Sequence, residues 1–219
     1  KIPPHNLGEV IDATLHLLER PDDSPDDLMK FVKGPDFPTG AQILGRQGIL
    51  DAYRTGRGSV KMRAIAEIEE TNRDTRIIVT EFPYEVSVES VEEKIFELVK
   101  SGELDGISSM QNDSAGRQSR LVIKLKRDAN ANVVLNKLFK NTALQTTFAV
   151  NTLALVDGVP RTLNLAQVLT HYIAHQVEVV TRRTQFRLRK AEARAHIVEG
   201  LLRAIDMLDQ VIATIRGSD

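Results

Sequence analysis

The fold of this chain is decided by residues 45–63, which read GRQGILDAYRTGRGSVKMR. Apolar side chains at helical spacing predict a short helix from Gly48 to Thr55. Its inward face is expected to hold Ile49, Leu50 and Ala52. Gly56 stands where a left-handed C-cap belongs, because glycine has no Cβ to clash there. We therefore expect a helix that ends in a glycine turn.

Directly after this turn, the spacing of apolar residues changes from helical spacing to every second residue. Apolar residues at 60, 62, 64, 66 and 68 alternate with Ser59, Lys61, Arg63 and Glu67. The apolar set is Val60, Met62, Ala64, Ala66 and Ile68. Period two is typical of a strand with one buried face, so we expect a strand from Val60 to Glu69.

The same stretch is strongly basic, with one acid, Asp51, among its residues. Its cations are Arg46, Arg54, Arg57, Lys61 and Arg63. Arginines beside glycines suit phosphate, since the backbone can come close and the guanidinium grips two oxygens. The stretch alone leaves two interpretations open, a contact with the DNA backbone or a solvated basic edge.

Composition narrows the possible functions. The 219 residues carry a net charge of −1, so nucleic-acid binding would require a local basic patch. The chain has no cysteine, which excludes disulfides and thiol chemistry and fits a reducing cytoplasm. No apolar run approaches the ~20 residues of a membrane span. The start at Lys1, without an initiator Met or a signal peptide, predicts a fragment.

Residues 1–33 are expected to form two helices. The first begins at Asn6, with Glu9 in a capping-box-like position, and ends near Arg20. Its expected inward stripe is Leu7, Val10, Ile11, Thr14, Leu15 and Leu18. The second is short, with Ser24 as N-cap and Pro25 at its first position.

Residues 34–163 mix strands and helices, which predicts an α/β or α+β layer. An irregular segment at 34–40 precedes a short strand at 41–44, and a turn at 71–74 makes a hairpin with a strand at 75–82. A helix follows from Ser87 or Ser90 to Gly102, with Val91, Ile95, Phe96, Leu98 and Val99 inward. Two further strands are predicted near 106–110 and 120–127. A helix is predicted at 129–139, with an inward face of Val133, Val134, Leu138 and Phe139. We expect β structure over 144–155, followed by a hairpin turn at Asp157-Gly158.

Residues 164–219 predict a long helix, continuous from Leu165 to Ile215, with Asn164 and Gln167 as a cap-like start. Its last third has an apolar coiled-coil seam that requires a partner helix. The seam is Ile197, Leu201, Ala204, Leu208, Val211 and Ile215. Its middle is basic, either as a solvated face or as a surface toward DNA, through Arg182, Arg183, Arg187, Arg189, Lys190 and Arg194.

Catalytic chemistry has few candidates. His171 and His175 are spaced i, i+4, but no third ligand stands at metal spacing, so no metal site is expected. Neither a phosphate-binding Walker loop nor a nucleophile elbow is present. Tyr53, between arginines, is a candidate nucleophile or, alternatively, a packing residue of its helix.

Several motifs in order resemble the breakage-reunion subunit of bacterial type IIA DNA topoisomerases. They are IPPHNL at 2–7, GPDFPT at 34–39, AYRTGRG at 52–58, VTRRT at 180–184, LRKA at 188–191 and AHI at 195–197. The match runs from Lys1 to about Arg216. The AYRTGRG form is closer to gyrase A subunits than to their topoisomerase IV counterparts, without settling the choice.

The resemblance implies an α+β tower layer at 34–163, preceded by a helical link at 1–33 from a winged-helix domain. A coiled-coil arm would follow at 164–219. It implies a cytoplasmic, ATP-dependent isomerase that introduces negative supercoils into double-stranded DNA. The catalytic tyrosine would lie outside this fragment, which would hold no catalytic residue, cofactor or metal and would be inactive alone.

The resemblance also implies the partners. Mg²⁺ and ATP would sit on the B subunit of an A2B2 gyrase assembly, in which the A subunits form a homodimer, with no membrane contact. The DNA-binding set would extend to His5, Asn6, Arg182 and Arg183. A non-enzymatic DNA-binding or coiled-coil scaffold, with the seam as its working surface, is the alternative.

Overall fold

The computed structural model describes residues 1–71, 74–116 and 118–218. It divides into two compact units, Lys1–Thr170 and His171–Asp219. Among the described residues, no helix combines the length and apolar character needed to cross a membrane. The three-part division expected from the sequence stays a prediction.

The N-terminal helices are α1, Leu7–Glu19, and α2, Pro25–Leu28. Both caps are confirmed. The Asn6 side chain accepts hydrogen bonds from the backbone N–H groups of Gly8 and Glu9, and Ser24 forms a capping box with Asp27. The predicted inward stripe of α1 is wrong in Leu7, Ile11, Leu15 and Leu18, which are exposed. The helix buries Ala13 and Leu17 instead, because apolar residues occupy both of its faces.

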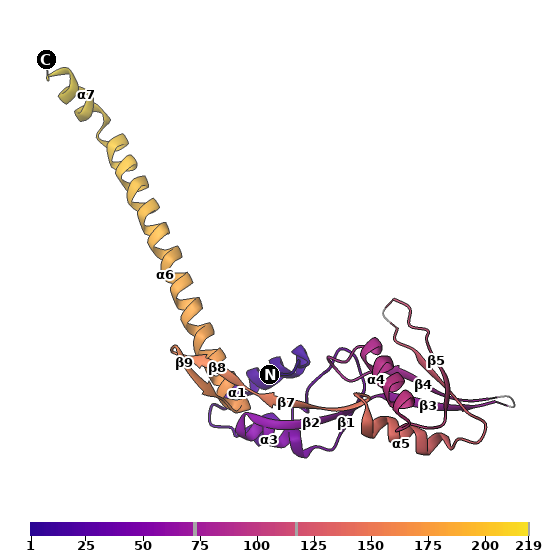
Figure 1. The fold of residues 1–219 in the computed structure, drawn as a ribbon. Helices are drawn as coiled ribbons and strands as arrows, with labels where there is room; N and C mark the ends of the chain where they lie inside the picture. Colours follow the sequence, from indigo (N-terminus) through magenta and orange to yellow (C-terminus); the bar gives the residue numbers. More distant parts are fainter. Residues whose placement is uncertain (72–73, 117, 219) are drawn as a thin grey trace. The chain divides into compact units, whose positions relative to one another are not determined.

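The first sheet is antiparallel, in the order β1 (Gln42–Leu44), β2 (Arg57–Arg63), β7 (Gln145–Asn151). Helix α3, Gln47–Thr55, packs against β2, as Figure 1 shows. Its buried residues are Ile49, Ala52 and Tyr53. Gly56 caps α3 with φ 77°, which confirms the predicted left-handed turn.

The predicted strand from Val60 to Glu69 is wrong as a single strand. Ala64 separates β2 from β3, Ile65–Glu70, which belongs to a different sheet. The Ala64 N–H donates to the carbonyl oxygen of Leu144 at 2.7 Å, and a bulge follows between Ile65 and Ala66. Every second residue from Val60 to Ile68 is apolar across this break, so the periodicity of the sequence carries no sign of it.

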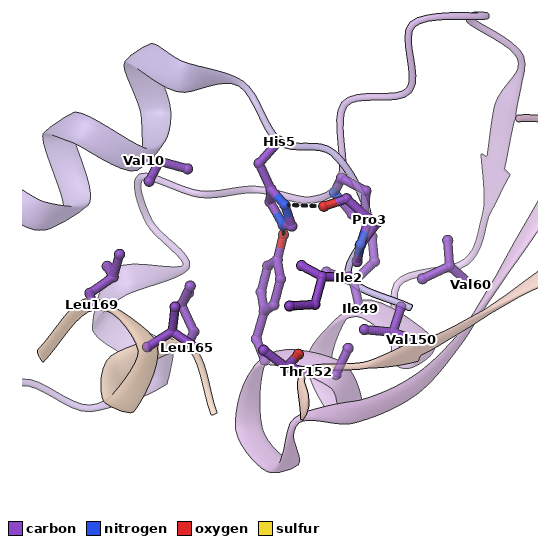
Figure 2. Close-up of a pocket in the computed structure, with 14 residues that line it drawn as sticks. Ile2, Pro3, His5, Val10, Ile49, Val60, Val150, Thr152, Leu165 and Leu169 are labelled. Carbon is purple, nitrogen blue, oxygen red and sulfur yellow. Dashed lines mark hydrogen bonds between the residues drawn. The ribbon is translucent and has the colours of Figure 1, made fainter. Parts of the chain in front are cut away.

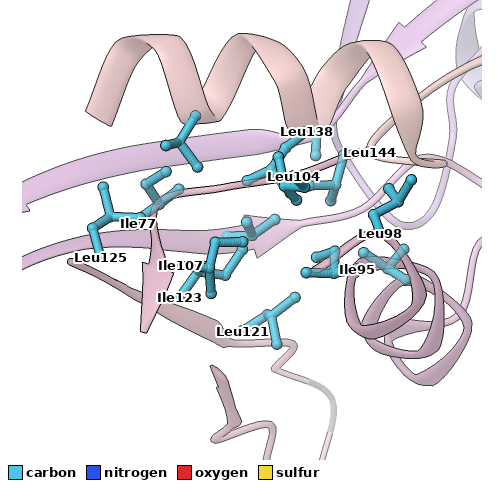
Figure 3. Close-up of a cluster of buried hydrophobic side chains, with 14 of the residues drawn as sticks. Ile77, Ile95, Leu98, Leu104, Ile107, Leu121, Ile123, Leu125, Leu138 and Leu144 are labelled. Atoms are coloured by element: carbon cyan, nitrogen blue, oxygen red, sulfur yellow. The ribbon is translucent and has the colours of Figure 1, made fainter. Parts of the chain in front are cut away.

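The second sheet is also antiparallel, in the order β3, β4 (Thr75–Glu81), β6 (Leu121–Leu125), β5 (Ile107–Asn112). Helices α4 (Val88–Ser101) and α5 (Ala131–Asn141) contribute to one core with it. Figure 3 shows that core, with Ile77 and Ile123 from the strands facing Ile95 and Leu138 from the helices. Antiparallel sheets with helices on the core side make this unit α+β.

The buried faces of α4 and α5 differ in part from the predicted ones. Phe96 and Val99 on α4 and Val133 on α5 are exposed, so their predicted inward placement is wrong. Of the two predicted N-caps of α4, Ser87 is the one that the structure shows.

The turn predicted at 71–74 includes 72–73, which lie outside the described residues. At its edges the Thr71 N–H donates to the Asp74 carbonyl oxygen at 2.9 Å.

The end of the chain is a hairpin followed by helices. Strands β8 (Leu153–Val156) and β9 (Val159–Thr162) pair across Asp157 and Gly158, whose φ values of 52° and 78° confirm the predicted tight turn. Helix α6 covers Leu165–Asp206, and α7 covers Leu208–Arg216.

The predicted continuous helix is therefore wrong at Met207, whose ψ of 19° interrupts it. Neither proline nor glycine stands at the break, so no local signal marks it. All six seam residues are exposed within the chain, and their coiled-coil role stays a prediction.

Candidate nucleic-acid interface

The outer face of the first sheet gathers three of the five cations of the opening stretch, Arg57, Lys61 and Arg63. We call it the basic face. It consists of Gln42, Leu44, Arg57, Ser59, Lys61, Arg63, Gln145, Thr147, Ala149 and Asn151, which lie opposite one another in the strand register. All ten residues are described, and none is Asp or Glu. Residues two apart on a strand are about 6.8 Å apart, the axial rise of two nucleotides in one DNA strand.

The buried side of β2 is held against α3 through glycines. A Cβ on Gly48 would overlap the carbonyl of Ser59, and a Cβ on Gly58 would lie 2.7 Å from the Ala52 Cβ. A Cβ on Gly56 would meet the Leu163 carbonyl. The chain's own atoms occupy the space beside these three glycines, so packing accounts for them, and their use for phosphate approach stays a prediction. They let α3 pack closely enough to orient β2.

Two of the predicted DNA-binding arginines are engaged inside the chain. Arg54 makes a fork with Asp26, Nε to Oδ1 at 2.7 Å and Nη2 to Oδ2 at 3.0 Å. This hydrogen bond lowers the pKa of Asp26 below its usual range. Arg63 donates from Nε to the Gln145 Oε1 at 2.8 Å, and its Cζ lies 4.7 Å from the centre of the Phe139 ring. Each keeps guanidinium N–H donors that these contacts do not use, so each could contact a phosphate only with its orientation already set by a partner in the chain.

The side chains of the other three predicted DNA-binding residues are exposed. Among the residues that the structure describes, none makes a hydrogen bond or ion pair with the side chains of Arg46, Arg57 or Lys61. Arg57 and Lys61 belong to the basic face, and Arg46 precedes the first turn of α3. Among the five predicted cations, these three have all of their side-chain donors available to an anionic ligand within the described part of the chain.

The N-terminal segment is tied to α3 through His5. Its Nδ1 lies 2.8 Å from the Pro3 carbonyl oxygen, drawn as a dashed line in Figure 2, and its Nε2 lies 2.7 Å from the Tyr53 hydroxyl oxygen. Tyr53 is 6% exposed, and burial raises the pKa of its phenol above the usual range. A buried phenol with a raised pKa is a poor nucleophile, which favours the packing interpretation of Tyr53 over the catalytic one. Asn6 is occupied as the N-cap of α1.

The remaining candidates lie in the second unit. Arg182 pairs with Glu178 at 3.3 Å, and Arg183 is exposed. His171 and His175 are exposed as well, and among the described residues no group of three or more His, Asp or Glu side chains is placed to hold a metal ion. The contribution of Arg182 and Arg183 to DNA binding stays a prediction.

Sequence reasoning missed the neutral half of the basic face. Thr147, Ala149 and Asn151 on β7 lie opposite Lys61, Ser59 and Arg57. Their alternation with buried Phe148 and Val150 is the one signal that could have found them. Which strand pairs with β2, more than 80 residues away, is not visible in that alternation.

The whole chain, which includes this α+β unit, matches a known family. The family model that describes the A subunit of DNA gyrase and topoisomerase IV matches residues 1–219. The chain belongs to this family, which confirms the resemblance to type IIA topoisomerase subunits.

Its relatives include several gyrase A subunits. The chain is 58% identical over 217 residues to the DNA gyrase A subunit of Halalkalibacterium halodurans, covering 99% of this chain and 26% of that protein. It is 53% identical over 223 residues to the DNA gyrase A subunit of Streptomyces coelicolor, covering 100% and 26%. For the DNA gyrase A subunit of Mycobacterium tuberculosis the identity is 51% over 224 residues, covering 100% and 27%. The chain thus spans about a quarter of the length of these curated relatives.

Proposed function

We propose that this chain is part of the breakage-reunion subunit of a DNA gyrase and that it holds double-stranded DNA by its phosphates. The family match and the identities with gyrase A subunits support the assignment. In this proposal the parent enzyme cuts one duplex, passes another through and reseals the first. The fragment supplies a rigid surface and no bond-breaking group.

The observation that carries the proposal is the basic face. Its exposed cations Arg57 and Lys61 stand on one strand, and none of the ten described residues that form the face is acidic. Lysine and arginine on a sheet contact phosphate oxygens and position a duplex without reading its sequence. Binding should therefore be independent of sequence and sensitive to salt.

The rest of the machinery is proposed to lie on other parts of the assembly. The catalytic tyrosine belongs elsewhere in the gyrase A subunit, since the phenol of Tyr53 is buried and hydrogen-bonded. Mg²⁺ and ATP belong to the gyrase B subunit in an A2B2 assembly. The A subunit of topoisomerase IV is the alternative within the family.

The exposed seam supports a second role for the chain. Ile197, Leu201 and Leu208 are each more than half exposed, and Ala204, Val211 and Ile215 complete the stripe along α6 and α7. We propose that this stripe is the first arm of a coiled coil. A scaffold that self-associates through the stripe without binding DNA is the competing function.

Cross-linking from single cysteines tests the DNA proposal, because the native chain has no cysteine. Ala149→Cys places a photoreactive label on the basic face without removing a cation, and Ser109→Cys places the same label on exposed β5 as the control. We expect Ala149→Cys to cross-link to duplexes of unrelated sequence and Ser109→Cys to do so much less. Equal yields from both positions would refute the assignment of the basic face.

A further inference from the structure

A pocket of about 260 Å³ lies within the N-terminal unit and is separate from the free cations. Its lining residues come from the segment before α1, from α1, α3, β2 and β7, from Pro35 and Thr152, and from the first two turns of α6. Figure 2 shows Leu165 and Leu169 across the pocket from Val60 and Val150. An apolar cavity of about 150 Å³ is enough to bind benzene. This pocket therefore has room for one substituted aromatic ring.

The walls are apolar and uncharged. Side chains that form them include Ile2, Val10, Ile49, Val150, Leu165 and Leu169. All lining residues are described, and none is Asp, Glu, Lys or Arg. Transfer of a charged ligand into such walls would leave its charge without a partner, so the pocket selects a neutral molecule.

Its polar end is formed by Tyr53 and His5. The Pro3 carbonyl oxygen can only accept, so the His5 Nδ1 donates to it and carries the ring proton. Burial lowers the pKa of His5, which keeps the ring neutral and its Nε2 an acceptor. The Tyr53 hydroxyl therefore donates to Nε2, and its oxygen retains a lone pair that can accept one further hydrogen bond.

We propose that this pocket binds a small neutral aromatic molecule with one hydrogen-bond donor, such as a phenol, whose donor faces the Tyr53 oxygen. The bound ring contacts the N-terminal segment, α3 and the start of α6 at once. Such a ligand stabilises the arrangement of these elements within the unit by binding the folded state alone. Arg57 and Lys61 do not line the pocket, so the site is independent of the DNA proposal.

The test uses the 219-residue chain with phenol, toluene and benzoate as probes, followed by methyl NMR. We expect phenol to cause saturable chemical-shift changes in the methyl groups of Val10, Ile49 and Leu169. Toluene should bind more weakly, and benzoate should not bind. Tyr53→Phe should weaken phenol binding about five- to tenfold and leave toluene unchanged, because only phenol uses the lost acceptor. An unchanged ratio of phenol to toluene affinity would overturn the assigned ligand class.

Pocket-filling variants test the location. Val168→Phe and Val10→Phe each put a ring into the pocket from a half-buried position, and Val133→Phe makes the same exchange at an exposed position of α5. Whichever filling variant retains the native melting transition should lose phenol binding, whereas Val133→Phe should keep it. Phenol binding that survives filling, or no saturable binding to the native chain, would overturn the site. Arg57→Ala should weaken DNA binding and leave phenol binding unchanged, which separates this proposal from the DNA proposal.

Discussion

Gly58→Ala tests whether the glycines of the opening stretch pack α3 or admit phosphate. A Cβ at this position would overlap the Gly48 carbonyl and lie 2.7 Å from both the Cβ and the backbone N of Ala52. Backbone atoms on two facing elements cannot yield as a flexible side chain can. Overpacking of this kind costs about 1–3 kcal/mol, which at a urea m-value of about 2 kcal/mol/M lowers the midpoint by roughly 1 M.

The assay is urea unfolding of the first unit, combined with DNA affinity measured where the variant is folded. Gly200→Ala is the matched control, since nothing lies within 4 Å of its Cβ position and alanine favours a helix interior. It should leave the transition of the first unit unchanged. The packing account is refuted if Gly58→Ala keeps its midpoint but loses DNA affinity, because the glycine would then serve phosphate approach.

Three further predictions concern caps, charges and Tyr53. Ser24→Ala should lower the unfolding free energy by about 1 kcal/mol, because it removes the hydrogen bond to the Asp27 N–H; no change in calorimetry would contradict the cap. Hydrogen bonds from Lys30 and Ser24 lower the pKa of Asp27 to about 2, so its stabilising contribution is present above the unfolded pKa of about 3.9 and should be lost as pH falls toward 2. Asp27→Asn should flatten the dependence of stability on pH in this range. A loss of stability at low pH that is the same in Asp27→Asn as in the native chain would count against this role of Asp27. Tyr53→Phe should cost about 1 kcal/mol through the lost bond to His5 and leave the salt dependence of DNA binding unchanged; a changed dependence would place the phenol at the DNA surface.

Local signals in the sequence predicted most helix ends. The caps at Asn6, Ser24 and Ser87 and the glycine stops at Gly56 and Gly102 depend on residues within one turn, so they can be read without a fold. The buried faces were less predictable. In α1, apolar residues cover both faces, and the elements packed against Ala13 and Leu17 decide which is buried.

The candidate site was likewise predictable only in part. Residue type predicted the cations, but their availability depends on partners far along the chain. Asp26, 28 residues from Arg54, and Gln145, 82 residues from Arg63, engage two of the five. The break at Ala64 likewise depends on the Leu144 carbonyl. Such pairings are set by tertiary contacts, which alternation and spacing do not encode.

The central claim, that the basic face grips duplex phosphates, is tested most directly by the salt dependence of DNA binding. Arg57→Ala/Lys61→Ala is compared with the native chain and with Lys100→Ala/Lys137→Ala, which removes the same charge from exposed positions of α4 and α5. Two lost phosphate contacts should reduce the slope of log K against log salt by about 1.8. Between about 50 and 200 mM salt the native chain should then lose about twelvefold more affinity than the variant. A slope unchanged by Arg57→Ala/Lys61→Ala, or reduced equally by the control, would contradict the account.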